Sequence, residues 1–167
     1  MKKKVLIFKN DRTGDLFVSL KAINKIINKH SNENIEIFLS NINHKFSFLF
    51  PKIEKKIYSM NLTLFEKVKL FIFFIFNRID TVYILTPKNF YYYLPFFFFR
   101  KVKFHAITIK AKKRRPAKFL LKFLYKYVEI DRINIRKRKS SYVIQQELVD
   151  TNLNQNFLNN HSKLDHS

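Results

Sequence analysis

The sequence lacks cysteine and tryptophan, and its 167 residues include a single glycine. Without cysteine the chain can form no disulfide, thiolate nucleophile or zinc ribbon. Long hydrophobic runs are also missing, because the most apolar stretches, residues 70–76 and 90–99, are shorter than the ~18 residues of a spanning helix. The basic start "MKKK" is followed by an apolar run too short for a signal peptide. We therefore expect a cytoplasmic protein, or one bound peripherally to the inner face of the plasma membrane.

Positive charge dominates the sequence. The chain carries 33 Lys and Arg against 12 Asp and Glu, for a net charge of +21. Such a field attracts phosphate on nucleic acid, nucleotides or anionic lipid, and charge alone does not choose among them. Hydrophobic residues make up 47% of the chain, which argues against disorder. We predict one domain over residues 1–153, followed by a polar, frayed tail over residues 154–167.

Apolar periodicity predicts strands that alternate with helices. Helical spacing and capping residues predict the helices, and Pro95 should kink or split one of them. This alternation is typical of a Rossmann-like α/β fold, a parallel sheet with flanking helices. The predicted strands are residues 4–8, 35–39, 53–58, 81–85 and 102–109, and the predicted helices are residues 15–27, 43–50, 89–99, 119–128 and 142–153. One further long helix is predicted, with Asn61 or Thr63 as its cap, Glu66 in its first turn and its end near Ile79.

Gly14 lies in the turn "KNDRTGDLF", between the first predicted strand and the first long helix. In parallel sheets, ligands bind beyond the carboxyl ends of the strands. The glycine could take a positive φ or let a ligand approach the backbone closely. Asp15 could cap free N–H groups at the helix start, or it could act as a general base, and the two roles are compatible. The turn matches neither the dinucleotide-binding fingerprint nor the P-loop.

The stretch "VLIFKNDRTGDLFVSLKAINKI" resembles the opening of family 9 glycosyltransferases, the heptosyltransferase-like enzymes of lipopolysaccharide assembly. The likeness rests on a strand, a polar segment that ends in Gly14-Asp15, and a following helix with Ser19 and Leu20. The later "IDTVYILTP" resembles a further strand of that family. Two positions depart from its pattern: Thr13 stands where Leu or Ile is common, and Lys21 where Pro is frequent.

The resemblance implies a two-lobed GT-B enzyme that transfers a sugar from a nucleotide sugar to a lipid-linked glycan acceptor. This sequence has the length of the N-terminal acceptor lobe, so a partial form without the donor lobe is expected, and its activity as an enzyme stays open. Asp15 is then the catalytic residue, and Lys9, Arg12, Thr13 and Gly14 bind the acceptor. No cofactor and no metal is expected.

A basic loop contains Lys110, Lys112, Lys113, Arg114 and Arg115. It could be a solvated surface, a contact with anionic membrane, or, as the third choice, a contact with nucleic acid. The alternative to a transferase is therefore a non-catalytic basic module that binds anionic membrane or nucleic acid. The aromatic runs suit the core better than a membrane interface, but they contain too many consecutive aromatics for all to point inward.

Overall fold

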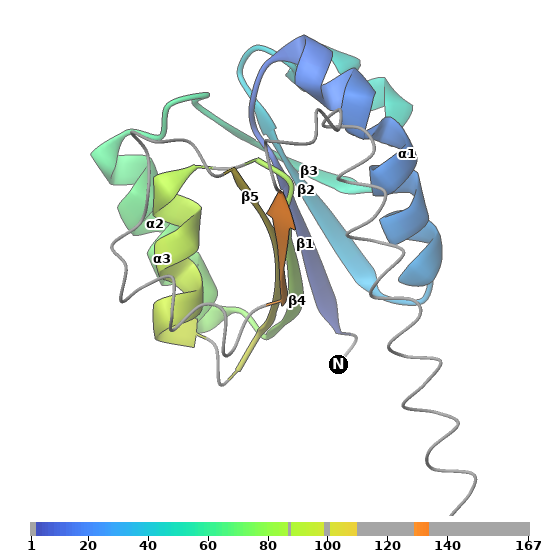
Figure 1. Cartoon of the computed structure of the whole chain (residues 1–167). Coiled ribbons are helices and arrows are strands. Elements are labelled where there is room, and N and C mark those ends of the chain that lie inside the picture. Colours follow the sequence, from blue (N-terminus) through green and yellow to red (C-terminus); the bar gives the residue numbers. More distant parts are fainter. Residues whose placement is uncertain (1–2, 87, 99–100, 110–128, 134–167) are drawn as a thin grey trace, which may run out of the picture.

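The computed structural model describes residues 3–86, 88–98, 101–109 and 129–133. Within these ranges the chain forms a six-stranded sheet in which all neighbouring strands are parallel (Figure 1). The Rossmann-like α/β fold predicted from the sequence is thus confirmed. The strands are β1 (Lys4–Lys9), β2 (Asn34–Ser40), β3 (Glu54–Tyr58), β4 (Ile79–Ile84), β5 (Lys103–Ile109) and β6 (Glu129–Ile133).

Helices cover both faces of the sheet. Figure 1 shows α1 on one side of the strands, and α2 and α3 together on the other. The short η1 packs on the α1 side, where its Phe46 ring contacts Phe17 of α1. None of the helices in the described ranges is long and apolar enough to cross a membrane. The helices are α1 (Thr13–Lys29), η1 (His44–Leu49), α2 (Leu64–Phe76) and α3 (Asn89–Phe98).

Strand β1 lies at the centre of the core. Val5 and Ile7 belong to a buried cluster with Ile23 of α1, whereas Leu6 and Phe8 belong to a second cluster on the α2–α3 side. Successive side chains of a strand point to opposite faces, so a strand covered on both faces reads as one continuous apolar run. This explains why residues 4–8 could be recognised as a buried strand from the sequence alone.

The strand order is β3-β2-β1-β4-β5-β6. The chain therefore builds outward from β1 to β3, crosses back through α2, and builds outward again from β4 on the other side of β1. In such sheets the two strands at which the order reverses diverge at their carboxyl ends and leave a crevice for ligands. The candidate site is therefore expected where β1 and β4 end.

Several expectations need correction. Of the two caps considered for the long helix, Thr63 is confirmed and Asn61 is not the cap: Thr63 and Glu66 form a capping box, and α2 begins at Leu64. It ends at Phe76, since the chain enters β4 at Ile79. Strand β6 was missed, because its short, charged sequence reads as part of a basic segment. The helices predicted over 119–128 and 142–153 and the tail after residue 153 lie outside the described residues.

Pro95 does not split its helix, because α3 runs through it. A proline inside a helix removes one backbone hydrogen bond and costs about 3 kcal/mol. Tyr91, Leu94 and Phe98 of α3 are buried in the core cluster on the α2–α3 side of the sheet, and this burial offsets the cost of the proline. The aromatic run thus contributes to the core, as expected, and Tyr93, Phe96 and Phe97 stay exposed.

Candidate functional site

The loop that follows β1 is shorter than predicted, because α1 already begins at Thr13. Gly14 therefore lies in the first helical turn, and it has no positive φ. Of the two roles considered for Gly14, the positive φ is therefore wrong. A Cβ added at Gly14 would meet no atom within 4 Å, so the protein itself does not require glycine here. Close approach of a ligand to this exposed backbone stays a prediction.

Asp15 also lies in the first turn of α1, and its side chain is exposed. Arg12 is the N-cap residue, and it forms no side-chain capping bond. Asp15 is thus not the N-cap, although its negative charge is favourable near the positive end of the helix dipole. Its backbone oxygen accepts a hydrogen bond from the Ser19 hydroxyl at 2.6 Å. The carboxylate is left facing solvent at the mouth of the sheet.

Lys9, predicted to bind an acceptor, is almost fully buried. Its ammonium donates to Asp11 Oδ2 at 2.8 Å and lies 3.5 Å from the Leu85 carbonyl oxygen. The Thr86 hydroxyl donates to the same Asp11 oxygen at 3.1 Å. The structure thus places the Lys9 charge against a carboxylate of its own chain, and this contact joins the end of β1 to the segment after β4.

Asp11 is the carboxylate that this arrangement encloses. Burial raises the pKa of Asp11, and the nearby Asp15 charge acts in the same direction, whereas Lys9 and Thr86 oppose the shift. Its Oδ1 is buried and has no hydrogen-bond partner among the described residues. A group in this state can accept a hydrogen bond from a ligand hydroxyl that reaches the end of β1.

Lys88, which follows β4, forms hydrogen bonds to the segments after β1 and β3. Its ammonium donates to the backbone oxygen of Asn10 at 2.5 Å and to that of Met60, which follows β3. Burial lowers the pKa of Lys88 to about 8, although the Asp11 carboxylate acts in the opposite direction. The Tyr91 hydroxyl donates to Asn10 Oδ1 at 2.5 Å, and burial raises the pKa of Tyr91.

Ser40 and Asn43 fix the end of β2 in the same way. The Asn43 side-chain amide donates to the Lys9 backbone oxygen at 2.9 Å, and the Ser40 hydroxyl donates to the Asp11 backbone oxygen at 2.7 Å. We call this set the carboxyl-edge network. It consists of Lys9, Asn10, Asp11, Ser40, Asn43, Thr86, Lys88 and Tyr91.

The network is a largely buried platform, and the exposed Arg12, Gly14 and Asp15 lie next to it on the chain. Sequence reasoning singled out the loop residues and Lys9. It missed the roles of the residues at and after the ends of β2 and β4. The sequence did hold a signal: polar residues such as Ser40, Asn43 and Thr86 lie at or shortly after the ends of apolar strands. Because parallel strands end at the same edge of a sheet, these residues could have been expected near the loop after β1.

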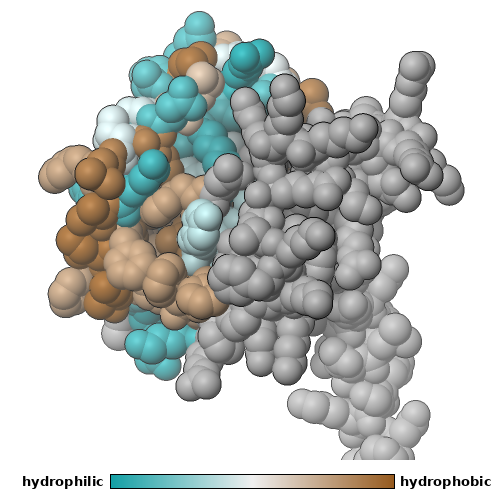
Figure 2. All heavy atoms as spheres, turned by 60° about the vertical axis from the view of Figure 1, so that its left-hand side comes forward, coloured by the Kyte–Doolittle hydropathy of each residue, from teal (hydrophilic) through white to brown (hydrophobic). Residues whose placement is uncertain are grey.

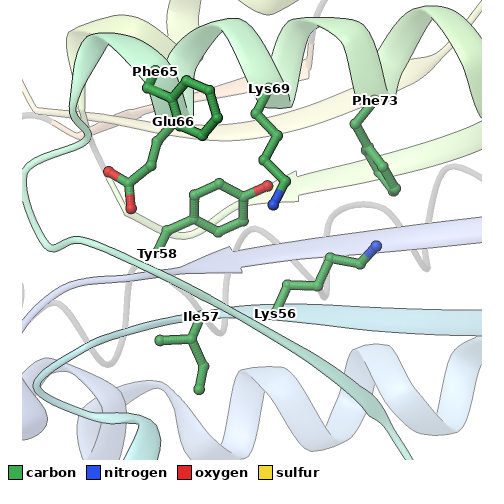
Figure 3. Close-up of a pocket in the computed structure, with 7 residues that line it drawn as sticks. All are labelled: Lys56, Ile57, Tyr58, Phe65, Glu66, Lys69 and Phe73. Atoms are coloured by element: carbon green, nitrogen blue, oxygen red, sulfur yellow. The ribbon is translucent and has the colours of Figure 1, made fainter.

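A pocket of 390 Å³ lies elsewhere, between α2 and the edge strand β3. Figure 3 shows Lys69 and Phe73 extending from α2 toward β3, and Lys56 and Tyr58 extending from β3 into the same space. Lys56 pairs with the buried Glu36 at 3.2 Å. None of the residues of the carboxyl-edge network lines this pocket.

The remaining predicted site residues, Lys110, Lys112, Lys113, Arg114 and Arg115, lie outside the described residues. Within the described ranges, no group of three or more His, Asp or Glu side chains could hold a metal ion.

Comparison with known proteins supports the fold and goes no further. No family model and no curated protein matches the sequence. Two solved structures of the E. coli heptosyltransferase WaaC are similar, one with ADP and one with ADP-2-deoxy-2-fluoro heptose. In both cases the TM-score is 0.56 at 14% identity, over 89% of this chain and 47% of the neighbour. The chain thus spans about half the length of these neighbours, and its Rossmann-like α/β fold resembles one lobe of a GT-B glycosyltransferase.

Proposed function

We propose that this chain is the acceptor lobe of a heptosyltransferase-like glycosyltransferase of cell-surface glycan assembly. Such an enzyme transfers a sugar from a nucleotide sugar to a lipid-linked glycan. The fold likeness supports a glycosyltransferase, and the sequence resemblance around Gly14-Asp15 supports the family and the lobe. The nucleotide sugar would be bound by a second lobe, which the experiments below supply.

Asp15 would act as the general base. Its carboxylate takes the proton of an acceptor hydroxyl, and the oxygen of that hydroxyl attacks the anomeric carbon of the donor. The bond between that carbon and the nucleotide's phosphate oxygen breaks, and a nucleoside diphosphate leaves with the bonding electron pair. The observation that carries this role is the exposed carboxylate in the first turn of α1, beside the crevice between β1 and β4.

Arg12, Thr13 and Gly14 would hold the acceptor. The Arg12 side chain is exposed and can pair with a phosphate or carboxylate of the acceptor. The Gly14 backbone is open for close approach. We revise the role of Lys9: its ammonium is paired with Asp11, so it would hold the loop in place and would not bind the acceptor directly.

The test compares Asp15→Asn with the wild type in a two-lobed protein, made by joining or co-expressing this chain with a donor lobe. Loss of a general base typically lowers the rate by roughly 10²–10⁴-fold. The matched control is Glu54→Gln, an exposed carboxylate on edge strand β3, which should leave the rate unchanged. A rate for Asp15→Asn within about threefold of the wild type would contradict the proposed base.

The isolated chain gives a second test. It should transfer no sugar, because the donor would bind to the other lobe. A phosphorylated sugar acceptor should nevertheless shift the backbone amide resonances of Thr13, Gly14 and Asp15, and Arg12→Ala should weaken this binding. Sugar transfer by the chain alone, or shifts confined to other strand ends, would argue against an acceptor lobe with this site.

A further inference from the structure

Helix α2 is apolar on its solvent side as well as on its core side. Leu70 and Phe74 are buried against the sheet. A helix that is hydrophobic all round is normally enclosed, by protein or by membrane. The outward side chains of α2 that stay exposed are Leu64, Phe65, Val68, Ile72, Ile75 and Phe76.

Helix α3 extends this apolar surface. Its Tyr93, Phe96 and Phe97 are also exposed, and the Phe97 ring contacts Phe71 of α2 at 5.4 Å. We call these three residues and the six of α2 the α2–α3 face. Figure 2 shows apolar residues gathered on the side of the molecule that these helices cover, with hydrophilic residues at the margin. Contiguous exposed apolar surface of this kind marks a contact site.

The charges around the face are mostly positive. Lys69 projects from α2, and Arg78 and Lys101 follow the ends of α2 and α3; all three are exposed. Between residues 64 and 106 the sequence holds two carboxylates, Glu66 and Asp80. The first is engaged in the capping box, and the second lies 4.0 Å from the Lys3 ammonium. An apolar surface with a basic margin is complementary to a surface with an apolar interior and anionic groups above it.

We propose that the α2–α3 face docks on an anionic lipid bilayer. The phenylalanine and aliphatic side chains would enter the boundary between headgroups and acyl chains, and the basic residues would meet lipid phosphates. Helix α2 has 13 residues, fewer than the ~20 needed to span a bilayer, so it would lie in the plane of the interface.

The net charge favours this occupant over a second copy of the chain. Each copy carries +21, so two copies repel each other, whereas an anionic bilayer attracts the protein. The pocket beside α2 lies at the margin of the face, because Phe65 and Lys69 line it (Figure 3). A docked bilayer would therefore bring lipid headgroups close to Lys56 and Tyr58.

The absence of tryptophan allows a direct test. Phe76→Trp places a fluorophore on the face. Phe48→Trp is the matched control, since Phe48 is an exposed phenylalanine on η1, on the opposite side of the sheet. With vesicles of equal parts phosphatidylcholine and phosphatidylglycerol, emission of the Phe76→Trp protein should shift to the blue, and brominated acyl chains should quench it. Emission of the control should change in neither respect.

A pair of polar variants tests the energetics. Ile72→Gln/Phe76→Gln should lower partitioning into these vesicles about tenfold or more, whereas Ile42→Gln/Phe48→Gln on the η1 side should not. All four side chains are exposed, and far-UV circular dichroism checks that the variants fold. Unchanged partitioning of the face variant would overturn the proposal, as would equal partitioning of the wild type into pure phosphatidylcholine vesicles.

Other occupants of the face would give different signals. If another part of the chain covers it, the Phe76→Trp emission is already blue-shifted without lipid at every protein concentration. If a second copy covers it, the blue shift without lipid grows with protein concentration. Either result would overturn docking on a bilayer.

Discussion

Replacing Asp11 by alanine should destabilise the fold strongly, because the ammonium of Lys9 would be left without its counter-charge. The Lys9 side chain is only 2% exposed, and Asp11 Oδ2 lies 2.8 Å from its ammonium nitrogen. After the substitution, the Leu85 carbonyl oxygen at 3.5 Å is the remaining acceptor that the structure gives to this ammonium. The buried charge can then regain little of the solvation that it lost on folding.

Breaking a buried pair by removing one partner typically costs about 3–5 kcal/mol. Asp11 is 15% exposed, so some water can reach the vacated space, and we expect about 3 kcal/mol. For a chain of this length that corresponds to a fall in Tm of roughly 6–12 °C. Lys9→Met should cost less, since the raised pKa of Asp11 eases protonation of its carboxyl group. The double variant removes both charges, so its cost should fall short of the sum by about 2 kcal/mol.

The assay is urea unfolding of the wild type, the two single variants and the double variant, followed by circular dichroism at neutral pH. The coupling between the two substitutions is read from the four free energies of unfolding. A loss below about 1 kcal/mol for Asp11→Ala, or additive single and double variants, would refute the inference that this pair holds the carboxyl-edge network together.

Three further outcomes are expected. Thr63→Ala removes the hydroxyl that accepts from the Glu66 backbone N–H, so the free energy of unfolding should fall by about 1 kcal/mol; equal urea midpoints would contradict this cap. Gly14→Ala should raise the free energy of unfolding by roughly 0.5–1 kcal/mol, since the site is helical and open, and it should weaken acceptor binding if a ligand approaches this backbone; a loss of stability would mean that the helix start is misassigned. Burial lowers the pKa of His30 below 6.5, so the unfolded chain binds more protons as the pH falls below that value, and stability should decline toward pH ~5; His30→Gln should flatten the decline, and an unchanged slope would exclude His30 as its source.

Local sequence patterns determined several of the strands and helices. The run from Val5 to Phe8 is apolar because both faces of β1 are covered, and that requirement is visible in the sequence itself. The spacing of Thr63 and Glu66, three residues apart, is likewise typical of a capping box and predicts the start of α2. The alternation of such elements predicts a parallel sheet, because a crossover helix is needed between parallel strands.

The candidate site was predictable only in part, because some of the residues that form it lie far apart in the sequence. Residues 9–15 are neighbours in sequence, so the turn could be recognised there. The contact of Asp11 with Thr86 joins residues 75 positions apart, and Lys88 reaches Asn10 across 78. Such partners depend on the strand order, which places β4 beside β1, and no local pattern encodes that order.

The sequence by itself thus determined the fold class, the central strand, and the placing of Gly14 and Asp15 at the first strand-to-helix junction. Only the tertiary structure decided that Lys9 is paired internally and that Gly14 is an ordinary helical residue. It also decided which aromatic residues stay outside. The hydrophobic sequences of α2 and α3 predict that these helices bury apolar surface. They do not say which side chains are buried. In the structure α2 packs against one face of the sheet, and the side chains on its opposite side stay exposed.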